Sequence, residues 1–358
     1  MKNSGTSRAR EGAMGQGYAK HSRVQHEAND YGIPLLTRAL EVVPLPLAGE
    51  AFRAADLGAA AGTNSLKPMR AVVEGIRRRT GNLTPVVINH TDILANDFNA
   101  LLATVSGHSA TYTSVPQVFT YVEARSFYEP LFPPAEVHLA WSAIAVHWLS
   151  RLDLPIADHI YCSRATGQAL EAMKERSRKD WERFLNHRAT ELRAGGQLIV
   201  LGGACADETS SGAEALLDTA NAVLADQVKQ KMITGDEYAR MTIPTWNRTE
   251  AEFLAPLQTG DLAKSFKLEE HALVELPDVL LEKYRTSGDA QAFAAEVTAF
   301  FQAAFQPSLF SSLRPSRSQS ELKVLSDAFA AGMRARILTD PTAVETNWHV
   351  VTLRLTRR

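Results

Sequence analysis

The sequence contains only two cysteines, Cys162 and Cys205, among its 358 residues. Neither lies in a C-x-x-C pair or in a Cys/His spacing, so the pattern favours neither a zinc site nor a disulfide framework. We expect both to be small, buried hydrophobic side chains in a reducing compartment. The scarcity of cysteine therefore predicts a cytoplasmic protein.

An excess of one charge and long apolar runs are also missing. The 38 basic residues nearly balance the 40 acidic ones and leave a formal charge of -2, so no overall field steers the chain onto nucleic acid or an anionic membrane. No stretch of eighteen apolar residues occurs, and residues 1–14 hold no apolar segment that could serve as a signal. We expect no nucleic-acid or membrane partner, and a small molecule as substrate.

The composition is that of a globular protein, with 45% hydrophobic and 22% charged residues. At roughly 100 to 200 residues per domain, the length allows two domains, or one large domain with insertions. Five short apolar segments precede a glycine pair or a polar turn, and helical patterns separate them. Strands are expected at residues 52–58, 85–89, 118–122, 137–141 and 197–201. This alternation favours a parallel sheet covered on both faces.

After Gly203 the alternation ends and helical patterns dominate. Helices are expected at residues 211–232, 250–257, 280–316 and 321–336, and strands at 266–276 and 349–358. In the last strand Val351, Leu353 and Leu355 alternate with polar residues, which is typical of a strand with one solvated face that can run antiparallel. Phe300 and Phe305 belong to an apolar stripe that we expect to be core.

Two aspartates and a glycine-containing turn form the strongest candidate for a ligand site. Asp56 ends the first strand, the turn G-A-A-A-G-T-N follows it, and Asp92 ends the second strand. Ligands bind at such strand ends in open α/β sheets. The turn is not G-x-G-x-x-G and has no phosphate-binding lysine, so a pyrophosphate or nucleoside triphosphate is disfavoured. A cationic amino group at Asp56 and a ribose at Asp92 would fit S-adenosylmethionine; alternatively, the two aspartates only cap helices.

Several longer motifs occur in a fixed order along the chain. They are Y-A-K-H-S from Tyr18, A-D-L-G-A-A-A-G-T-N-S-L from Ala55, T-D-I-L-A-N-D-F-N from Thr91, S-F-Y-E-P-L-F-P from Ser126, V-H-L-A-W-S-A-I-A-V-H-W-L-S from Val137, K-D-W-E-R-F-L from Lys179 and I-P-T-W-N-R-T-E-A-E from Ile243. From about Met14 onward the chain thereby resembles the SABATH methyltransferases. That family includes carboxyl methyltransferases of salicylate, benzoate, jasmonate and indole-acetate, and N-methyltransferases of the caffeine pathway.

The resemblance implies a fold and a division of the chain. The fold is α/β, with a Rossmann-like class I methyltransferase sheet that is mostly parallel, an antiparallel last strand and a helical cap. Residues 1–13 would form a mobile tail and 14–30 an N-terminal active-site lid. The core would comprise residues 31–205, completed by 262–277 and 318–358, and the cap over the acceptor pocket would comprise 206–261 and 278–317.

The resemblance also assigns a cofactor site. It implies that S-adenosylmethionine is surrounded by Ser22, Asp56, Asn64, Asp92, Ile93, Ser126 and Phe127. The first three would face its methionine end, Asp92 its ribose, and Ser126 with Phe127 its adenine. The cysteine-serine-serine turn of the family is Ala59 to Ala61 here, which would leave the backbone groups of the turn to do that binding.

The acceptor site is assigned in the same way. Gln25 and Trp148 would donate hydrogen bonds to the carboxylate of the acceptor acid, and Tyr18 would close over the site. His147 precedes Trp148 and is a candidate base, and Ile144 stands where the family has a tyrosine, which predicts a more aliphatic pocket. No cluster of metal ligands is evident, and the family suggests a homodimer.

These residues predict an S-adenosylmethionine-dependent O-methyltransferase that converts a small, largely apolar carboxylic acid to its methyl ester. Because a carboxylic acid with a pKa of about 4 is ionised at neutral pH, direct in-line transfer would need no obligatory general base. Two alternatives are an N-methyltransferase of a heteroaromatic ring and a catalytically degenerate subunit that only binds cofactor or acid.

Overall fold

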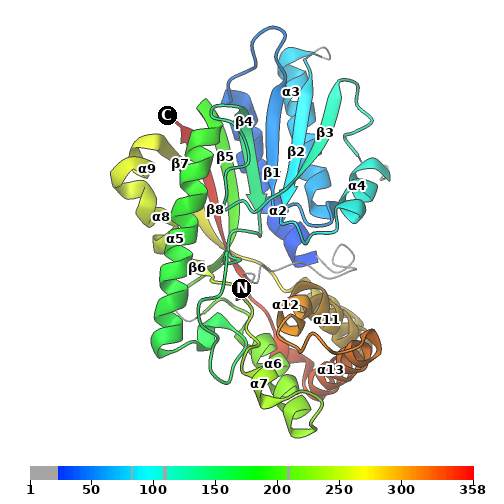
Figure 1. The fold of residues 1–358 in the computed structure, drawn as a ribbon. Coiled ribbons are helices and arrows are strands. Elements are labelled where there is room, and N and C mark those ends of the chain that lie inside the picture. The colour runs from blue at the N-terminus through cyan, green and yellow to red at the C-terminus, as the bar shows by residue number, and fades with distance from the viewer. Residues whose placement is uncertain (1–22, 82–83, 108–110, 208–209) are drawn as a thin grey trace, which may run out of the picture.

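The computed structural model describes residues 23–81, 84–107, 111–207 and 210–358, with the backbone alone for residues 23–27. Its centre is an eight-stranded sheet in the order β3-β2-β1-β4-β5-β8-β7, with β6 paired to β5 (Figure 1). The strands are β1 (Phe52–Leu57), β2 (Val86–Asp92), β3 (Val118–Ala124), β4 (Val137–Ala143), β5 (Leu192–Cys205), β6 (Arg248–Thr249), β7 (Phe266–Glu275) and β8 (His349–Arg357).

The sheet is parallel except at its last strand. β8 pairs antiparallel with both β5 and β7, whereas the pairs among β1 to β6 are all parallel. This confirms the predicted mostly parallel α/β fold with an antiparallel last strand. The expected solvated face of that strand is limited to its end, because β8 lies inside the sheet and residues 350–353 are buried on both faces.

Helices cover both faces of the sheet. One face packs against α2 (Arg23–Val42), α3 (Leu66–Thr80) and α4 (Phe98–Gly107), and the other against α5 (Gly167–Glu191), α8 (Glu250–Gln258) and α9 (Gly260–Ser265). Successive strand residues serve opposite faces: Ala54 packs with the first group of helices and Ala55 with the second. Because side chains alternate along a strand, an apolar run such as that of β1 can be buried on both sides.

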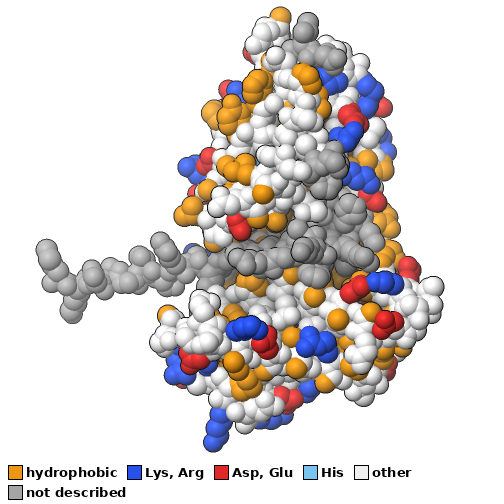
Figure 2. Space-filling view, turned by 90° about the vertical axis from the view of Figure 1, so that its right-hand side faces the viewer, with side chains coloured by type: hydrophobic (Ala, Val, Ile, Leu, Met, Phe, Trp, Pro, Cys, Tyr) orange, Lys and Arg blue, Asp and Glu red, His pale blue; other side chains and the backbone are white. Residues whose placement is uncertain are grey.

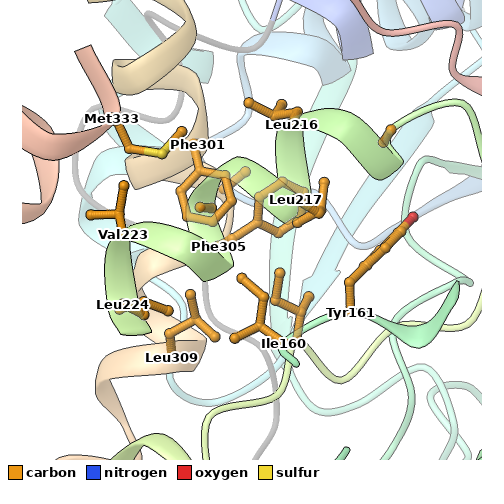
Figure 3. Close-up of a cluster of buried hydrophobic side chains, with 14 of the residues drawn as sticks. Ile160, Tyr161, Leu216, Leu217, Val223, Leu224, Phe301, Phe305, Leu309 and Met333 are labelled. Atoms are coloured by element: carbon orange, nitrogen blue, oxygen red, sulfur yellow. The ribbon is translucent and has the colours of Figure 1, made fainter. Parts of the chain in front are cut away.

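A third layer of helices lies below the carboxyl ends of the strands (Figure 1). It comprises α6 (Glu214–Lys229), α7 (Gly235–Tyr238), α10 (Val279–Ser287), α11 (Ala290–Ala304), α12 (Gln306–Phe310) and α13 (Gln319–Thr339). We call this layer the helical cap. Figure 3 shows its own apolar cluster, in which Leu217 and Val223 of α6 lie near Phe301, Phe305 and Met333.

The predicted division into tail, lid, core and cap by residue number stays a prediction. Its boundary between residues 30 and 31 falls inside α2, and it separates α13 from α11 and α6, with which α13 packs. Short 3-10 turns at Thr63–Ser65, Cys162–Arg164 and Pro341–Val344 complete the described secondary structure.

Basic and acidic side chains are interspersed on the face seen in Figure 2, as the balanced charge of the sequence leads us to expect. No helix in the part of the chain that the structure describes is both long and apolar enough to span a bilayer.

Candidate functional site

A pocket of about 1000 Å³ opens at the carboxyl ends of β1, β2 and β4. We call it the strand-end pocket. It is lined by Asn29, Asp56, residues 58–65, Asp92, Ile93, Asn96, residues 126–128, Trp141, residues 143–145 and residues 148–150. It therefore brings together the predicted residues Asp56, Asn64, Asp92, Ile93, Ser126, Phe127, Ile144 and Trp148. Tyr18 and Ser22 lie outside the described residues, as does the side chain of Gln25.

Asp56 is fixed by a buried hydrogen-bond network. Its carboxylate oxygen Oδ2 lies 2.7 Å from Nδ1 of His90, its direct neighbour on β2, and Nε2 of His90 contacts the hydroxyl of Tyr112. A carboxylate only accepts hydrogen bonds, so Nδ1 of His90 donates to Asp56. Burial raises the pKa of Tyr112 and keeps that hydroxyl protonated. His90 was not predicted, although aligning the two strands would have placed it beside Asp56.

Asp92 shapes the turn that follows β1. Its oxygen Oδ2 accepts the N–H of Ala60 at 2.7 Å, and Oδ1 accepts the N–H of Ile93 at 2.8 Å. The N–H groups of Gly58 and Ala59 donate to the carbonyl of Thr91. These two contacts brace the turn after β1 and the start of the loop after β2, and neither donor belongs to a helix, since the 3-10 turn begins at Thr63 and α4 at Phe98. The N–H groups of Ala59 and Ala60 are engaged within the protein, although the sequence suggested them as ligand-binding groups.

Two non-glycine residues in the pocket wall have left-handed backbones. Ala60 has φ 46° and Ile144 has φ 52°, and Gly58 between β1 and the turn has φ 85°. A β-branched residue such as Ile144 rarely adopts this conformation, which costs of the order of 1–3 kcal/mol. The Ile144 N–H donates to the carbonyl of Leu201 at 2.7 Å and holds the conformation. Strain of this kind concentrates at functional sites.

Asn29 joins the site from α2. Its Nδ2 donates to the carbonyl of Asn64 at 2.9 Å, and both residues line the strand-end pocket. The amide oxygens Oδ1 of Asn29 and of Asn64 are buried without a hydrogen-bond partner among the described residues. Because buried polar atoms are nearly always paired in native proteins, these two acceptors indicate a ligand with donors. In the sequence, Asn29 falls on the same helical face as the apolar residues Leu36 and Leu40. This spacing could have predicted that Asn29 is buried, but it was not used.

Residues 144–150 form a segment that we call the Trp148 loop. Buried groups hold its backbone: the Tyr128 hydroxyl donates to the carbonyls of Val146 and Trp148, and Nη1 of Arg248 donates to that of Val146 at 2.6 Å. Asp180 of α5 accepts from the N–H and the hydroxyl of Ser150. The motifs that contain Asp180 and Arg248 were recognised, but neither residue was given a role.

The segment that carries Ser126 and Phe127 is also held from α5. Nη1 of Arg188 donates to the Phe127 carbonyl at 3.0 Å, and Arg188 forms a buried ion pair with Glu191 at 2.8 Å. Burial lowers the pKa of Arg188, and the charge of Glu191 opposes this shift. α5 therefore anchors both segments that close the strand-end pocket.

A second pocket of about 610 Å³ lies between the sheet and the helical cap. We call it the cap pocket. It is lined by Ile144, His147, Trp148, Tyr161, Gly203, Thr245, Asn247, Leu276, Phe300, Ala304, Phe305, Trp348, His349 and Val350. Ile144 and Trp148 line both pockets, so the two adjoin there. Phe300 and Phe305, expected to be core, are buried and also line the cap pocket.

His147 faces the cap pocket and is buried. Burial, with a smaller contribution from the charge of Arg248, lowers the pKa of His147 to about 3. The ring is therefore neutral at physiological pH. Among the residues that the structure describes, no group of three or more His, Cys, Asp or Glu side chains is placed to hold a metal ion.

Comparison with known proteins gives a consistent result. A family model described as SAM dependent carboxyl methyltransferase matches residues 5–353. Gibberellic acid methyltransferase 2 of Arabidopsis thaliana is 25% identical over 329 residues, which cover 86% of this chain and 84% of that protein. Probable 7-methylxanthine methyltransferase 3 of Theobroma cacao is 30% identical over 213 residues, covering 55% of this chain and 58% of the relative.

Among solved structures, loganic acid methyltransferase with SAH superimposes with a TM-score of 0.77. The alignment covers 97% of this chain and 98% of that chain, at 19% sequence identity. The described chain therefore has the same fold as that enzyme.

Proposed function

Because this chain belongs to the family of S-adenosylmethionine-dependent carboxyl methyltransferases, we propose that it methylates a small, largely apolar acid bound in the cap pocket. The cofactor would lie in the strand-end pocket. The observation that carries this assignment is that the two pockets adjoin at Ile144 and Trp148. A carboxylate in the cap pocket could therefore reach a group in the strand-end pocket.

The strand-end pocket fits the chemical groups of S-adenosylmethionine. The unpaired amide oxygens of Asn29 and Asn64 suit the N–H donors of its ammonium group, and the Asp56 carboxylate suits its positive charge. Asp92 would accept from the ribose hydroxyls. Bound there, the cofactor supplies the methyl group from its sulfonium centre.

The remaining cofactor contacts are proposed from the sequence resemblance. Ile93, Ser126 and Phe127 line the same pocket and would surround the adenine and ribose. Ser22 would contact the methionine end. Arg188 supports this arrangement, since it holds the Phe127 carbonyl from the buried side.

Positioning is the main task left to the acceptor residues. We propose that Trp148 and Gln25 donate hydrogen bonds to one carboxylate oxygen, which directs the other toward the cofactor, and that Tyr18 closes over the acid. Well-oriented reactants can gain roughly 7–11 kcal/mol from proximity. Ile144 would pack against the apolar part of the acid.

No residue needs to remove a proton. The acid is ionised at neutral pH, and its carboxylate oxygen is already a nucleophile. His147, with a pKa of about 3, would be a weak base, so we propose that it shapes the pocket and does not abstract a proton.

The first prediction tests the reaction. We expect the protein, incubated with methyl-labelled S-adenosylmethionine and a panel of acids and purine rings, to label acids as base-labile methyl esters. Trp148→Phe should lower kcat/KM for the acid by about 10- to 150-fold, since a hydrogen bond to a charged group contributes about 1.5–3 kcal/mol. Trp246→Phe is the matched control, because Trp246 is buried nearby but lines neither pocket.

Two other outcomes correspond to the alternative functions. Base-stable labelling of rings without labelling of any acid would establish a ring N-methyltransferase, an activity suggested by the name of the cacao relative. Tight cofactor binding with no product would indicate a subunit that binds without turnover.

A cytoplasmic location and a homodimer stay predictions. Cys162 and Cys205 are buried free thiols, and burial raises the pKa of Cys162 to about 12, as suits unreactive cysteines in a reducing compartment.

A further inference from the structure

The cap pocket contains an unusual number of polar atoms without partners. Four of its lining residues each carry a buried nitrogen or oxygen that has no hydrogen-bond partner among the described residues. These atoms are Nδ1 of His147, Oγ1 of Thr245, Nε1 of Trp348 and Nδ1 of His349. Because buried polar atoms in native proteins are nearly always paired, such a concentration in one cavity indicates that a ligand pairs them.

Asn247 adds an acceptor of fixed orientation. Its Nδ2 donates to the Tyr161 hydroxyl at 2.6 Å, that hydroxyl donates to Ser211 at 2.8 Å, and Ser211 donates to Glu214 at 2.7 Å. The Glu214 carboxylate at the end of this series can only accept, so each hydrogen bond of the series is donated in the direction of Glu214. Because Nδ2 of Asn247 is the donor in this series, its Oδ1 is the amide atom that can accept a hydrogen bond from a ligand.

Gly203 keeps space open beside that acceptor. A Cβ at this position would lie 3.0 Å from both Oδ1 of Asn247 and Nδ1 of His147. Both atoms thus border the volume that the missing side chain leaves. A ligand group placed there would meet an acceptor on one side and a ring nitrogen on the other.

The rest of the wall is apolar. Ile144, Leu276, Phe300, Phe305 and Val350 provide aliphatic and aromatic surface. The unpartnered polar atoms belong to residues that line the cap pocket and not the strand-end pocket. Trp148, where the carboxylate is proposed to bind, lines both pockets, whereas these residues line the cap pocket alone. A carboxylate directed from Trp148 toward the strand-end pocket would leave them to another group of the acid.

We propose that the acceptor acid carries at least one hydroxyl group remote from its carboxylate, and that the polar wall of the cap pocket binds this hydroxyl. The Trp348 N–H can only donate and Oδ1 of Asn247 can only accept, whereas a hydroxyl does both. A ketone or a second carboxylate would leave Asn247 unpaired. This inference rests on the proposed function, and it narrows the substrate class to hydroxylated acids with an apolar skeleton.

The test compares acids that differ by one hydroxyl: benzoate with 3- and 4-hydroxybenzoate, and decanoate with 10-hydroxydecanoate. We expect kcat/KM at least tenfold higher for the hydroxylated member of one or more pairs, because a site with buried polar groups discriminates against ligands that leave them unpaired. Thr245→Val and Trp348→Phe should each reduce this ratio toward one, because the loss of kcat/KM should be larger for the hydroxylated acid than for its unhydroxylated partner.

The control is Thr298→Val. Thr298 also has a buried, unpartnered hydroxyl, but it lies on α11 and lines neither pocket. Its variant should keep the ratio of the native protein. Using two independent variants keeps the test valid if one of them fails to fold.

Several results would overturn the inference. These are the absence of a preference for the hydroxylated acid in every pair, or equal losses for both members of a pair in the Thr245 and Trp348 variants. If no acid is methylated, the proposed function fails separately. The hydroxyl preference is then decided from the dissociation constants of the same pairs, measured by calorimetry with S-adenosylhomocysteine present.

Discussion

Asn29 illustrates how a single buried amide can link a covering helix to a ligand pocket. Its side chain is 1% exposed, it donates to the Asn64 carbonyl, and its own oxygen has no partner among the described residues. An unsatisfied buried acceptor costs about 1–3 kcal/mol, so a ligand donor that pairs with this oxygen would gain binding energy. A bound ammonium group would remove that cost.

The prediction at the residue scale concerns this amide. Asn29→Ala should weaken S-adenosylmethionine binding by about 10- to 150-fold, because a hydrogen bond to a charged group contributes about 1.5–3 kcal/mol. Titration calorimetry measures the change. Asn186→Ala is the control, since Asn186 also donates from a helix to a backbone carbonyl but lies on the outer surface of α5. An unchanged dissociation constant for Asn29→Ala would show that this amide does not contact the cofactor.

At this scale the sequence predicted the residues that occur in recognisable motifs. Asp56, Asp92, Ser126 and Trp148 do line one pocket, because each lies at or after the carboxyl end of a strand, and these ends share one edge of the sheet. His90 and Asn29 could not be found in this way. Their roles depend on strand register and on helix packing, which no local motif encodes.

At the scale of elements, α5 organises the site from a distance. Arg188 of α5 holds the Phe127 carbonyl, and Asp180 of α5 holds Ser150 of the Trp148 loop. Arg248, from β6, donates to the Val146 carbonyl of the same loop and to the Ser177 carbonyl of α5. The two arginines therefore support different segments: Arg188 holds the segment of Ser126 and Phe127, and Arg248 holds the Trp148 loop, which lines both pockets.

This separation gives a paired prediction. Arg248→Lys should raise KM for the acid and lower kcat more than it weakens cofactor binding, because the loop that it loosens carries Trp148, the proposed acceptor contact, and a lysine cannot bridge two carbonyls as a guanidinium does. Arg188→Lys should do the opposite and weaken cofactor binding more than it raises KM for the acid. Calorimetry and steady-state kinetics on both variants measure these effects. Equal changes in all constants for both variants would mean that the arginines only stabilise the fold.

Most elements followed from hydrophobic periodicity, and the exceptions have physical causes. The region 280–316 reads as continuous helix, but Gly288 has φ 69° and ends α10, and Asp289 caps α11 by accepting the Ala292 N–H. Glycines are common just after a helix, yet Gly195 and Gly196 lie inside β5 and do not end α5. α5 instead ends at Glu191, and Leu192 enters β5 directly, because that strand extends along β4 as far as Val137.

For the whole molecule, two buried histidines make stability depend on pH. Burial, with the charges of Arg193 and Arg53, lowers the pKa of His138 to about 3, and His147 has a similarly low pKa. In the unfolded chain a histidine titrates near 6.5. Between these values the unfolded state binds more protons, so the free energy of unfolding falls as the pH decreases from about 7 toward 3.

The corresponding prediction uses His138→Gln, which removes the titrating ring. From pH 7 to pH 5 the native protein should lose about 2 kcal/mol more stability than this variant, at roughly 1.4 kcal/mol per pH unit below the unfolded pKa. Urea unfolding at both pH values measures the difference. His271→Gln serves as the control, since His271 is 40% exposed, and its profile should follow that of the native protein. Parallel profiles for all three proteins would contradict the assignment.

The helical cap has an apolar cluster of its own, distinct from the two clusters that flank the sheet. Phe300 and Ala304, which line the proposed acceptor pocket, belong to α11, whereas Asp56 and Asp92, which line the proposed cofactor pocket, belong to β1 and β2. Substitutions in the α11 wall of the cap pocket therefore act on a different packing unit from substitutions at the ends of β1 and β2. Such a division allows related proteins to diverge in the acids that they esterify. It also makes α11 a suitable element for a mutant library that aims to change the acid specificity of this protein.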